Sequence, residues 1–310
     1  MKRQLISTSR LAEICGVSQG TVDRALNNRK GINPQTKARI LEKAREYGYR
    51  PNIHARSIAG GRSMLIGVIV FDLNNQYFSD ILIHIERQCS IKGYSTVVMF
   101  SNKDPQKEIE CIKNMFHMSL DGIIICPINQ GDEFENFLNS LNIPIVTIGN
   151  ELSSFPYSGI NNSDAMQDTV KYIIQKGSKK LIYVSPKLTA NNCTAQIKRL
   201  EAFKKVCIET NTDFCVTDIY SAKCINLLRK GDAYICPSDI YALQLYKTAK
   251  KNSMGIIGFD NLRIIDELEL KLDSISYNTE KTASLAVDSI INGMRITESI
   301  EYEIIKRGSV

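Results

Sequence analysis

The stretch Gly16 to Asn28, GVSQGTVDRALNN, decides the fold of the first part of this chain. Gly16 and Val17 predict a tight turn, and Ser18 is a residue type that commonly caps the start of a helix. The apolar residues after it recur at helical spacing and form one small stripe: Val22, Ala25 and Leu26. This pattern is typical of the second helix of a helix-turn-helix.

The other face of this predicted helix is polar, with Gln19, Gly20, Asp23, Arg24 and Asn27. Side chains near the N-terminal end of such a helix reach base edges in the major groove of DNA. Gly20 has no side chain to read a base, and it lowers helix propensity by about 1 kcal/mol relative to alanine. The stretch therefore predicts a recognition helix.

Two further helices are predicted around it. Ser7 can cap a helix over Thr8 to Cys15, whose apolar residues are Leu11, Ala12 and Ile14. Asn33-Pro34 is a strong helix start, and Gly48 ends the helix that follows. We expect that helix to run to Tyr47 and to turn four residues inward: Ala38, Leu41, Ala44 and Tyr47. Three helices in residues 1–50 can close a small core.

Residues 51–62 contain a short helix-compatible segment, Ile53 to Ala59, followed by Gly60-Gly61. A helix of about two turns is too short to be stable alone in water. We expect this linker to order only when another molecule stabilises it.

Residues 63–310 alternate apolar, strand-like runs with helical patterns. The predicted strands are Met64–Phe71, Ser95–Phe100, Gly122–Cys126, Ile143–Ile148, Leu181–Ser185, Ala233–Cys236 and Gly255–Phe259. The predicted helices lie near 77–92, 105–118, 132–141, 163–176, 195–210, 239–251 and 278–292. Such alternation indicates an α/β fold with parallel sheets covered on both faces. Ligands of doubly wound sheets bind outside the carboxyl ends of the strands.

The charge of the chain is unevenly distributed. Residues 1–63 hold 13 Lys or Arg against 4 Asp or Glu, whereas residues 64–310 hold 26 against 29. A basic head on a slightly acidic body indicates that the head binds nucleic acid.

Several classes of protein are disfavoured by the composition. No signal peptide follows the opening MKRQLIS, and the apolar runs are far shorter than a membrane span needs, so we expect a cytoplasmic protein. The nine cysteines form no CxxC pair and the three histidines are widely spaced, which favours buried thiols over disulfides or a zinc site. No cofactor is expected. No nucleophile with a placed base and no phosphate-binding loop appears, so an enzyme is disfavoured.

The segment from Leu11 to Gly60 resembles the head and hinge of the LacI/GalR family of bacterial transcription regulators. The resemblance is carried by the helix-turn-helix, the Asn-Pro-x-Thr helix start, GYRPN and ARSIAG, and it continues through SMLIGVIV, DGIII, IPIV, IGFDN and the closing EIIKRGS. It implies a three-helix head at 1–50, a hinge helix at 51–62 and a two-lobed effector-binding and dimerisation domain at 63–310, like a periplasmic binding protein. The lobes are expected at about 63–158 plus 278–300 and at about 159–277 plus 301–310.

The resemblance also implies which residues contact a pseudo-palindromic operator. Gln19, Gly20 and Arg24 fall at base-reading positions, next to the capping Ser18. Phosphate contacts are implied for Thr21, Asn27, Asn33 and Thr36. The alternative is that Asn33 and Thr36 only cap and solvate the third helix, and capping alone explains Asn33. In the hinge, Ile58 falls at the position of an apolar wedge in the minor groove, with Asn52 and Ala55 close to the groove. The alternative for Ile58 is an incidental apolar residue in a flexible linker.

A small-molecule effector, often a sugar or nucleobase, is implied between the lobes. The implied ligand-binding residues are Asp72, Asn75, Tyr77, Phe78, Asn150, Arg199, Ser238, Asp239, Asp260 and Tyr277. Carboxylates and a guanidinium can pair with vicinal hydroxyls, and an aromatic ring can stack on an apolar ligand face. Alternatively, Asp260 caps the following segment, Phe78 is core, and Arg199 pairs with Glu201 or a surface acid.

Some positions depart from the family pattern. Gly149 stands where sugar-binding members often have Asp, with Asn150 next to it, and Tyr277 replaces a frequent Gln. We expect a homodimeric regulator, a repressor as most members are, that responds to a sugar or sugar derivative. The alternative is a solute-binding protein of a transport system, which shares the two-lobed body. The basic head and the absence of a signal peptide argue against this alternative.

Overall fold

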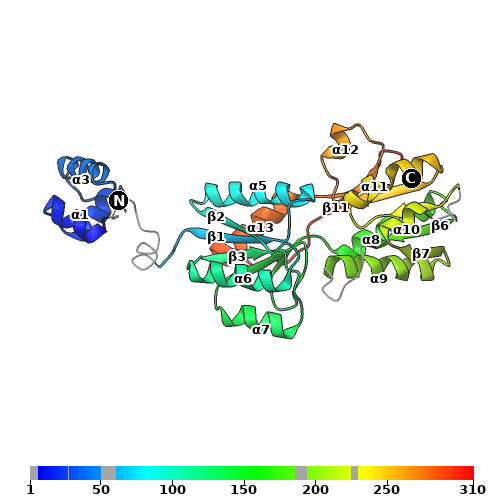
Figure 1. The fold of residues 1–310 in the computed structure, drawn as a ribbon, viewed down its shortest axis with the longest axis horizontal. Helices are drawn as coiled ribbons and strands as arrows, with labels where there is room; N and C mark the ends of the chain where they lie inside the picture. Colours follow the sequence, from blue (N-terminus) through cyan, green and yellow to red (C-terminus); the bar gives the residue numbers. More distant parts are fainter. Residues whose placement is uncertain (1–5, 27, 50–60, 186–193, 225–229) are drawn as a thin grey trace. The chain divides into compact units, whose positions relative to one another are not determined.

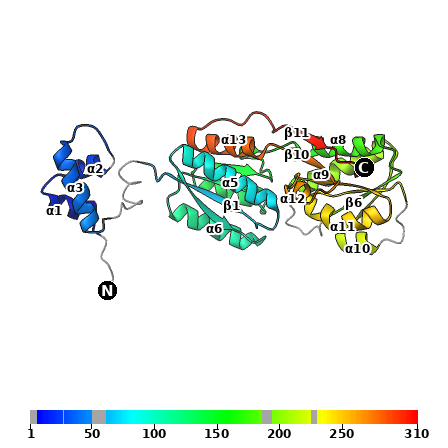
Figure 2. The same cartoon turned by 90° about the horizontal axis from the view of Figure 1, so that it is seen from above.

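The computed structural model describes residues 6–26, 28–49, 61–185, 194–224 and 230–310. The chain divides into two compact units, Met1–Ser63 and Met64–Val310 (Figures 1 and 2). The predicted hinge helix at 51–62 lies almost wholly outside the described residues.

The first unit contains three helices around a small core. They are α1 (Thr8–Cys15), α2 (Gln19–Leu26) and α3 (Pro34–Glu46). Leu11, Val22 and Ile40, one from each helix, are fully buried against each other. Ser7 caps α1 and Asn33 caps α3, as the sequence predicts, and Gly16 ends α1 in the left-handed conformation with φ 61°.

The inward face of α3 differs from the prediction. Ala44 is buried as predicted and Leu41 is half-buried, but Ala38 and Tyr47 are exposed, and Ile40 is the second buried residue of the helix. A strict period of three, as in 38, 41, 44 and 47, rotates by about 60° per step around a helix of 3.6 residues per turn. The pair Ile40 and Ala44, four apart, stays on one face, and the helix ends at Glu46 before Tyr47.

The first lobe of the second unit is a five-stranded parallel sheet of order β2-β1-β3-β4-β5. Its strands are β1 (Leu65–Val70), β2 (Ser95–Phe100), β3 (Gly122–Ile125), β4 (Ile145–Ile148) and β5 (Tyr157–Ser158). Four helices cover it: α5 (Gln76–Ile91) and α13 (Thr279–Asn292) on one face, α6 (Pro105–His117) and α7 (Asp132–Ser140) on the other (Figure 1). Successive strand residues point to opposite faces, which is why Val68 and Ile69 belong to different cores.

The second lobe is a six-stranded sheet of order β11-β10-β9-β8-β6-β7, in which only β11 runs antiparallel. Its strands are β6 (Lys180–Val184), β7 (Asp213–Thr217), β8 (Ala233–Ile235), β9 (Gly255–Phe259), β10 (Asp273–Tyr277) and β11 (Tyr302–Ile305). One face packs on α8 (Asn162–Gln175) and α9 (Thr194–Glu209). The other packs on α10 (Ile219–Cys224), α11 (Asp239–Lys251) and α12 (Ile264–Glu267).

The predicted class, two doubly wound lobes after a helical head, is confirmed. The chain passes between the lobes three times: from β5 to α8, from β10 to α13, and from α13 to β11. Seven cysteines are free thiols, of which Cys215 is half-buried and the other six are buried: Cys15, Cys89, Cys111, Cys126, Cys207 and Cys236. None of the described helices has the length and apolar character needed to cross a membrane.

Candidate functional site

The polar face of α2 is presented to solvent by the way its first turn is capped. Ser18 Oγ accepts a hydrogen bond from the Thr21 backbone N–H at 3.2 Å and lies 2.9 Å from the Thr21 hydroxyl. Gln19, Gly20 and Arg24 are exposed on this helix, free to approach another molecule.

Asp23 is the acidic residue on the same face. Its carboxylate pairs with the guanidinium of Arg29 at 3.2 Å, and both side chains are largely exposed. An acid at this position would repel phosphate, and the adjacent cation offsets that charge.

Asn33 and Thr36 mark the start of α3. Asn33 Oδ1 accepts from the backbone N–H groups of Gln35 at 2.9 Å and Thr36 at 3.4 Å. The capping role of Asn33 is thus present whatever else the residue does. The remaining predicted DNA contacts, Asn27, Asn52, Ala55 and Ile58, lie outside the described residues.

A pocket of about 810 Å³, including the space open to solvent at its mouth, lies between the two lobes of the second unit. Nine of the ten predicted ligand-binding residues line it: Asp72, Asn75, Tyr77, Phe78, Asn150, Arg199, Ser238, Asp260 and Tyr277. Most of them follow the carboxyl ends of β1, β4, β8 and β9, or close β10. The pocket is therefore built where doubly wound sheets bind their ligands.

Asp260 is the carboxylate at the centre of the pocket wall. Its two oxygens accept hydrogen bonds from Asn75 Nδ2 and from the Tyr277 hydroxyl, each at 3.0 Å. Burial raises the pKa of Asp260, and the Arg199 guanidinium opposes that rise. The carboxylate is held by groups from both lobes, since Asn75 caps α5 of the first.

Arg199 supplies the positive charge. It is 8% exposed, its Nε donates to Asn162 Oδ1 at 2.8 Å, and its Nη1 donates to the Pro237 carbonyl at 2.6 Å. The guanidinium carbon stacks 3.4 Å above the centroid of the Phe259 ring. This stacking and these neutral acceptors orient the guanidinium, so its position does not depend on an ion pair with Glu201.

The aromatic wall is also part of the core. Tyr77 and Phe78 are both nearly buried, and their ring centroids lie 5.1 Å apart. Phe71 packs edge-on against Phe78 at 4.5 Å, and Tyr277 lies 5.7 Å from Tyr77. Phe78 thus satisfies both interpretations offered by the sequence, because it belongs to the core cluster and lines the pocket.

The structure contradicts the predicted ligand contact of Asp239. This residue does not line the pocket and is fully buried; Oδ2 accepts from the Leu262 N–H at 2.8 Å and Oδ1 from the Ser274 hydroxyl at 2.7 Å. Both oxygens are consumed inside the protein, so the predicted ligand contact is replaced by a supporting one. Burial and the charge of Asp260 raise the pKa of Asp239 to about 8. Gly258 leaves room for it, since a Cβ there would lie 1.9 Å from Oδ1.

Lys103 lines the pocket and was missed by the sequence reasoning. Its ammonium pairs with Asp72 at 2.7 Å and lies 5.5 Å from the Phe71 ring centroid. The one signal in the sequence was its place just after the predicted strand Ser95–Phe100, since ligands bind beyond the carboxyl ends of strands. In the structure Asn102 and Lys103 both adopt positive φ. The other lining residues not predicted are Phe71, Asn74, Cys126, Gly149, Ala195, Gln196, Pro237, Ile240 and Tyr241.

Metal binding finds no support in the part of the chain that is described. There, no group of three or more His, Cys, Asp or Glu is placed to hold an ion.

Comparison with known families decides the assignment. Residues 11–52 match the family of bacterial regulatory proteins of the lacI type, and residues 63–214 match the periplasmic binding proteins and sugar binding domain of the LacI family. The chain belongs to the LacI family. It is a DNA-binding transcriptional regulator of this family and not an enzyme.

Relatives within the LacI family extend over most of the chain. Catabolite control protein A of Staphylococcus epidermidis is 26% identical over 277 residues, which cover 84% of this chain and 83% of the relative. The HTH-type transcriptional regulator RegA of Clostridium acetobutylicum is 29% identical over 320 residues, covering 94% and 96%.

Solved structures share the fold. The lac repressor dimer bound to operator and the anti-inducer ONPF superimposes with a TM-score of 0.82 at 17% identity, covering 99% of this chain and 100% of that one. The transcriptional regulator CelR in complex with cellobiose gives 0.67 at 17% identity, covering 98% and 100%. A LacI-type regulator from Alkaliphilus metalliredigens complexed with D-xylulofuranose gives 0.65 at 23% identity, covering 78% and 97%.

Proposed function

We propose that this LacI-family chain is a cytoplasmic, homodimeric repressor whose affinity for an operator changes when a sugar or sugar derivative occupies the pocket between its lobes. One observation carries the proposal: a single pocket brings together a carboxylate, a guanidinium, amides and aromatic faces from both lobes. Charged and amide groups bind vicinal hydroxyls, and the aromatic wall suits the apolar face of a sugar ring.

Two neighbours support the ligand class. The regulator CelR is described in complex with cellobiose, and the Alkaliphilus protein in complex with D-xylulofuranose. In this chain we assign ligand contact to Arg199, Asp260 and Asn75, with Tyr77 and Tyr277 against the ring.

The DNA side of the proposal rests on the exposed face of α2. We assign base contacts to Gln19 and Arg24, with the duplex backbone held by Thr21 and the start of α3. The lac repressor neighbour is described as a dimer bound to operator. In a dimer two such helices would face successive major grooves of an inverted repeat.

The effector and the operator are coupled through the hinge. We propose that closure of the lobes changes the separation of the two hinge segments in the dimer, and that Ile58 enters the minor groove only when these segments pair. Linkage then requires that DNA and effector alter each other's affinity by the same factor.

The alternative of a transport solute-binding protein is weaker. It accounts for the two-lobed body, but it leaves the match of residues 11–52 to a DNA-binding regulatory family without a purpose.

The test begins with thermal melting of the full chain against D-glucose, D-xylulose, cellobiose, sugar phosphates and nucleobases. A ligand at a hundred times its dissociation constant stabilises the folded state by about 2.7 kcal/mol, a readily measured shift. We expect a sugar to raise the melting temperature, Asp260→Asn to remove the shift, and Glu269→Gln, exposed on the same lobe, to keep it.

The stabilising sugar should then change the affinity for an inverted-repeat duplex in a gel shift. If only nucleobases raise the melting temperature, the proposed ligand class of sugars is wrong and nucleobases take its place. Equal binding of inverted-repeat and scrambled duplexes, with and without ligand, would overturn the regulatory function.

A further inference from the structure

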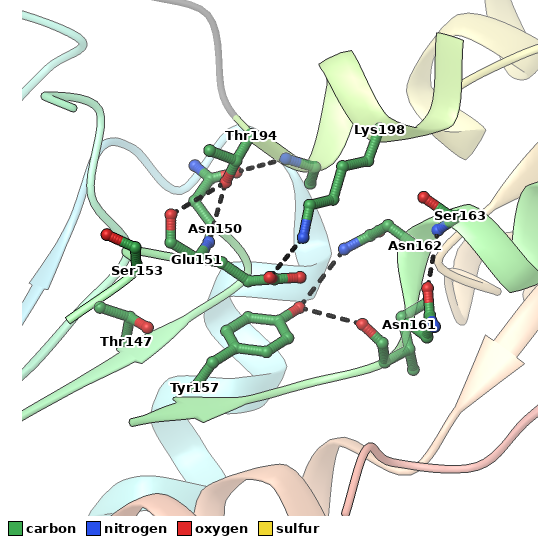
Figure 3. A network of polar contacts seen from close by, with 12 residues as sticks. Thr147, Asn150, Glu151, Ser153, Tyr157, Asn161, Asn162, Ser163, Thr194 and Lys198 are labelled. Carbon is green, nitrogen blue, oxygen red and sulfur yellow. Dashed lines mark hydrogen bonds and ion pairs between the residues drawn. The ribbon is translucent and has the colours of Figure 1, made fainter. Parts of the chain in front are cut away.

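A cluster of polar contacts joins the two lobes beside the pocket (Figure 3). Asn150 and Glu151 come from the loop after β4 in the first lobe. Thr194 and Ala195 come from the first turn of α9 in the second lobe, and Lys198 from the start of its second turn. We name this set of five residues the α9 latch.

Three hydrogen bonds of the latch connect the start of α9 with the loop after β4 in the opposite lobe. The Thr194 hydroxyl accepts from the Glu151 N–H at 2.8 Å and lies 3.2 Å from the Glu151 carbonyl, to which it donates. The Ala195 N–H donates to Asn150 Oδ1 at 3.3 Å. The first amides of a helix have no acceptor within the helix, and an Asn side chain is a preferred cap. Here that side chain belongs to the other lobe.

An ion pair adds to the cap. Lys198 Nζ donates to the carboxylate of Glu151, and Figure 3 shows the lysine side chain extending from the helix toward it. Both side chains remain partly exposed, at 40% and 30%, so the pair is accessible to substitution without opening the core.

The first-lobe side of the latch is firmly held. Asn150 is 3% exposed, and its Nδ2 donates to the Pro127 carbonyl at 2.8 Å. The amide group therefore has a fixed orientation, with Nδ2 anchored in its own lobe and Oδ1 directed at α9. If the lobes separate, Ala195 loses its acceptor.

The second-lobe side leads directly into the pocket. Gln196 and Arg199 lie in the same stretch of α9 as the latch residues, and both line the pocket. The latch residues and the guanidinium proposed to hold the ligand therefore share one short stretch of helix.

We propose that the α9 latch makes lobe closure, the order of the first turn of α9 and the placement of Arg199 one coupled event. Glu151, Thr194 and Lys198 are then positioning residues that set the fraction of molecules with a closed, ligand-ready pocket. The role of the latch in ligand response rests on the proposed function, whereas the coupling between lobe closure and the first turn of α9 does not.

The test is hydrogen–deuterium exchange on the full chain without ligand. Glu151→Gln, in the first lobe, should speed amide exchange in residues 195–198 of the second lobe by about fivefold, the effect of one lost polar contact. Thr194→Val should act similarly on the Glu151 amide, and Thr194→Ser, which keeps the hydroxyl, should restore protection. The charge exchange of Glu151→Lys with Lys198→Glu should recover most of the loss.

The matched control is Lys205→Met. Lys205 lies on the same helix, is 62% exposed and pairs only loosely with Glu209 at 4.0 Å. It should leave exchange in residues 195–198 unchanged. An unaltered rate there in Glu151→Gln, or an equal increase in Lys205→Met, would overturn the latch.

A second readout connects the latch to the ligand. In melting titrations with the sugars named above, latch variants should need several-fold more ligand for the same shift. If no sugar shifts the melting temperature, the proposed ligand class fails while the exchange result still decides the latch.

Discussion

Asp260 and Asn261 adopt backbone angles that residues with a side chain rarely take, with φ of 102° and 49°. Such conformations cost about 1–3 kcal/mol each and persist where surrounding contacts impose them. Here the Asn261 N–H donates to Ser274 Oγ, whose hydroxyl donates to Asp239, and Arg307 Nη2 holds the Asn261 side chain. These contacts hold the turn that carries Asp260 at the pocket wall, where Asn75 and Tyr277 bind its carboxylate.

The raised pKa of Asp239 makes a prediction about pH. Because its folded-state value of about 8 lies above the ordinary 3.8, the folded protein holds the proton more tightly than the unfolded chain. The contribution of Asp239 to stability therefore declines as pH rises from about 4 and levels off above about 8. Asp239→Asn stays neutral, so it should lower the melting temperature most at about pH 5 and progressively less toward about pH 8.5.

This is measured by thermal melting across that pH range, with Glu269→Gln as an exposed control. A difference between wild type and Asp239→Asn that stays constant with pH would contradict the assignment of the proton to this residue.

Gly20 gives a second prediction at the scale of one residue. An added Cβ would lie 3.8 Å from Ser18 Oγ, an ordinary contact, so the described residues of the head leave room for a side chain at this position. Gly20→Ala should therefore stabilise α2 by up to about 1 kcal/mol. Gly16→Ala is the matched control, because its φ of 61° at the end of α1 should make alanine destabilising by a similar amount.

Hydrogen exchange in residues 8–46 of the full chain measures both changes. Slower exchange in Gly20→Ala and faster exchange in Gly16→Ala are expected. A destabilised Gly20→Ala head would mean that packing not visible in the static contacts requires the glycine.

At the scale of elements, a buried carboxylate on β10 binds the chain segment that follows the edge strand β11. Asp273 is fully buried; its Oδ1 accepts from the backbone N–H groups of Arg307, Gly308 and Ser309 at 2.7, 2.7 and 3.0 Å. The hydroxyl of Tyr172 donates to its other oxygen at 3.0 Å. This side chain holds the chain end that follows β11, together with hydrogen bonds made by the Arg307 and Ser309 side chains.

Asp273→Ala should lower the free energy of unfolding by about 2–4 kcal/mol, because several buried groups lose one acceptor. Exchange in residues 302–309 should rise before that in the first lobe. Asp213→Ala, which removes a 67% exposed partner of Lys180, should cost less than about 0.5 kcal/mol in the same urea titration. Similar losses for both variants would argue against the clamp.

The elements that the sequence predicted well are those with a strong, uninterrupted signal. β2, β9 and α11 have the bounds expected from apolar runs and helical spacing. The elements it missed are β5, β7, α10, α12, β10 and β11. β10 reads DSISY and carries the buried polar residues Asp273 and Ser274, so its hydrogen-bonded interior has no apolar pattern to detect. β7 is an edge strand, partly exposed, and only neighbouring strands fix it.

The candidate site was predictable because the carboxyl ends of the strands locate it and the family resemblance names its residues. Asp239 was misplaced because no local pattern tells whether the acid after Ser238 faces the pocket or turns under the next loop. Lys103 was missed because a charged loop residue looks like any solvated lysine until the fold brings Asp72 within 2.7 Å.

At the scale of the whole molecule, the head and body are separate packing units. The core cluster of the head contains only residues up to Tyr49, and the four clusters of the body begin at Met64. A fragment of residues 64–310 should therefore fold and, on the proposed function, remain dimeric while losing operator binding. Thermal melting, sedimentation and gel shift test these three properties, and an unfolded fragment would contradict the division into units.

The three crossings between the lobes have a consequence for engineering. The first lobe needs α13 from near the end of the chain, and the second lobe needs β11 from beyond α13. Neither lobe of the body is one continuous stretch of sequence, so a single splice point cannot transfer one lobe without the other. New specificity can be combined with an existing head only by grafting the entire body, or by changing the pocket one position at a time.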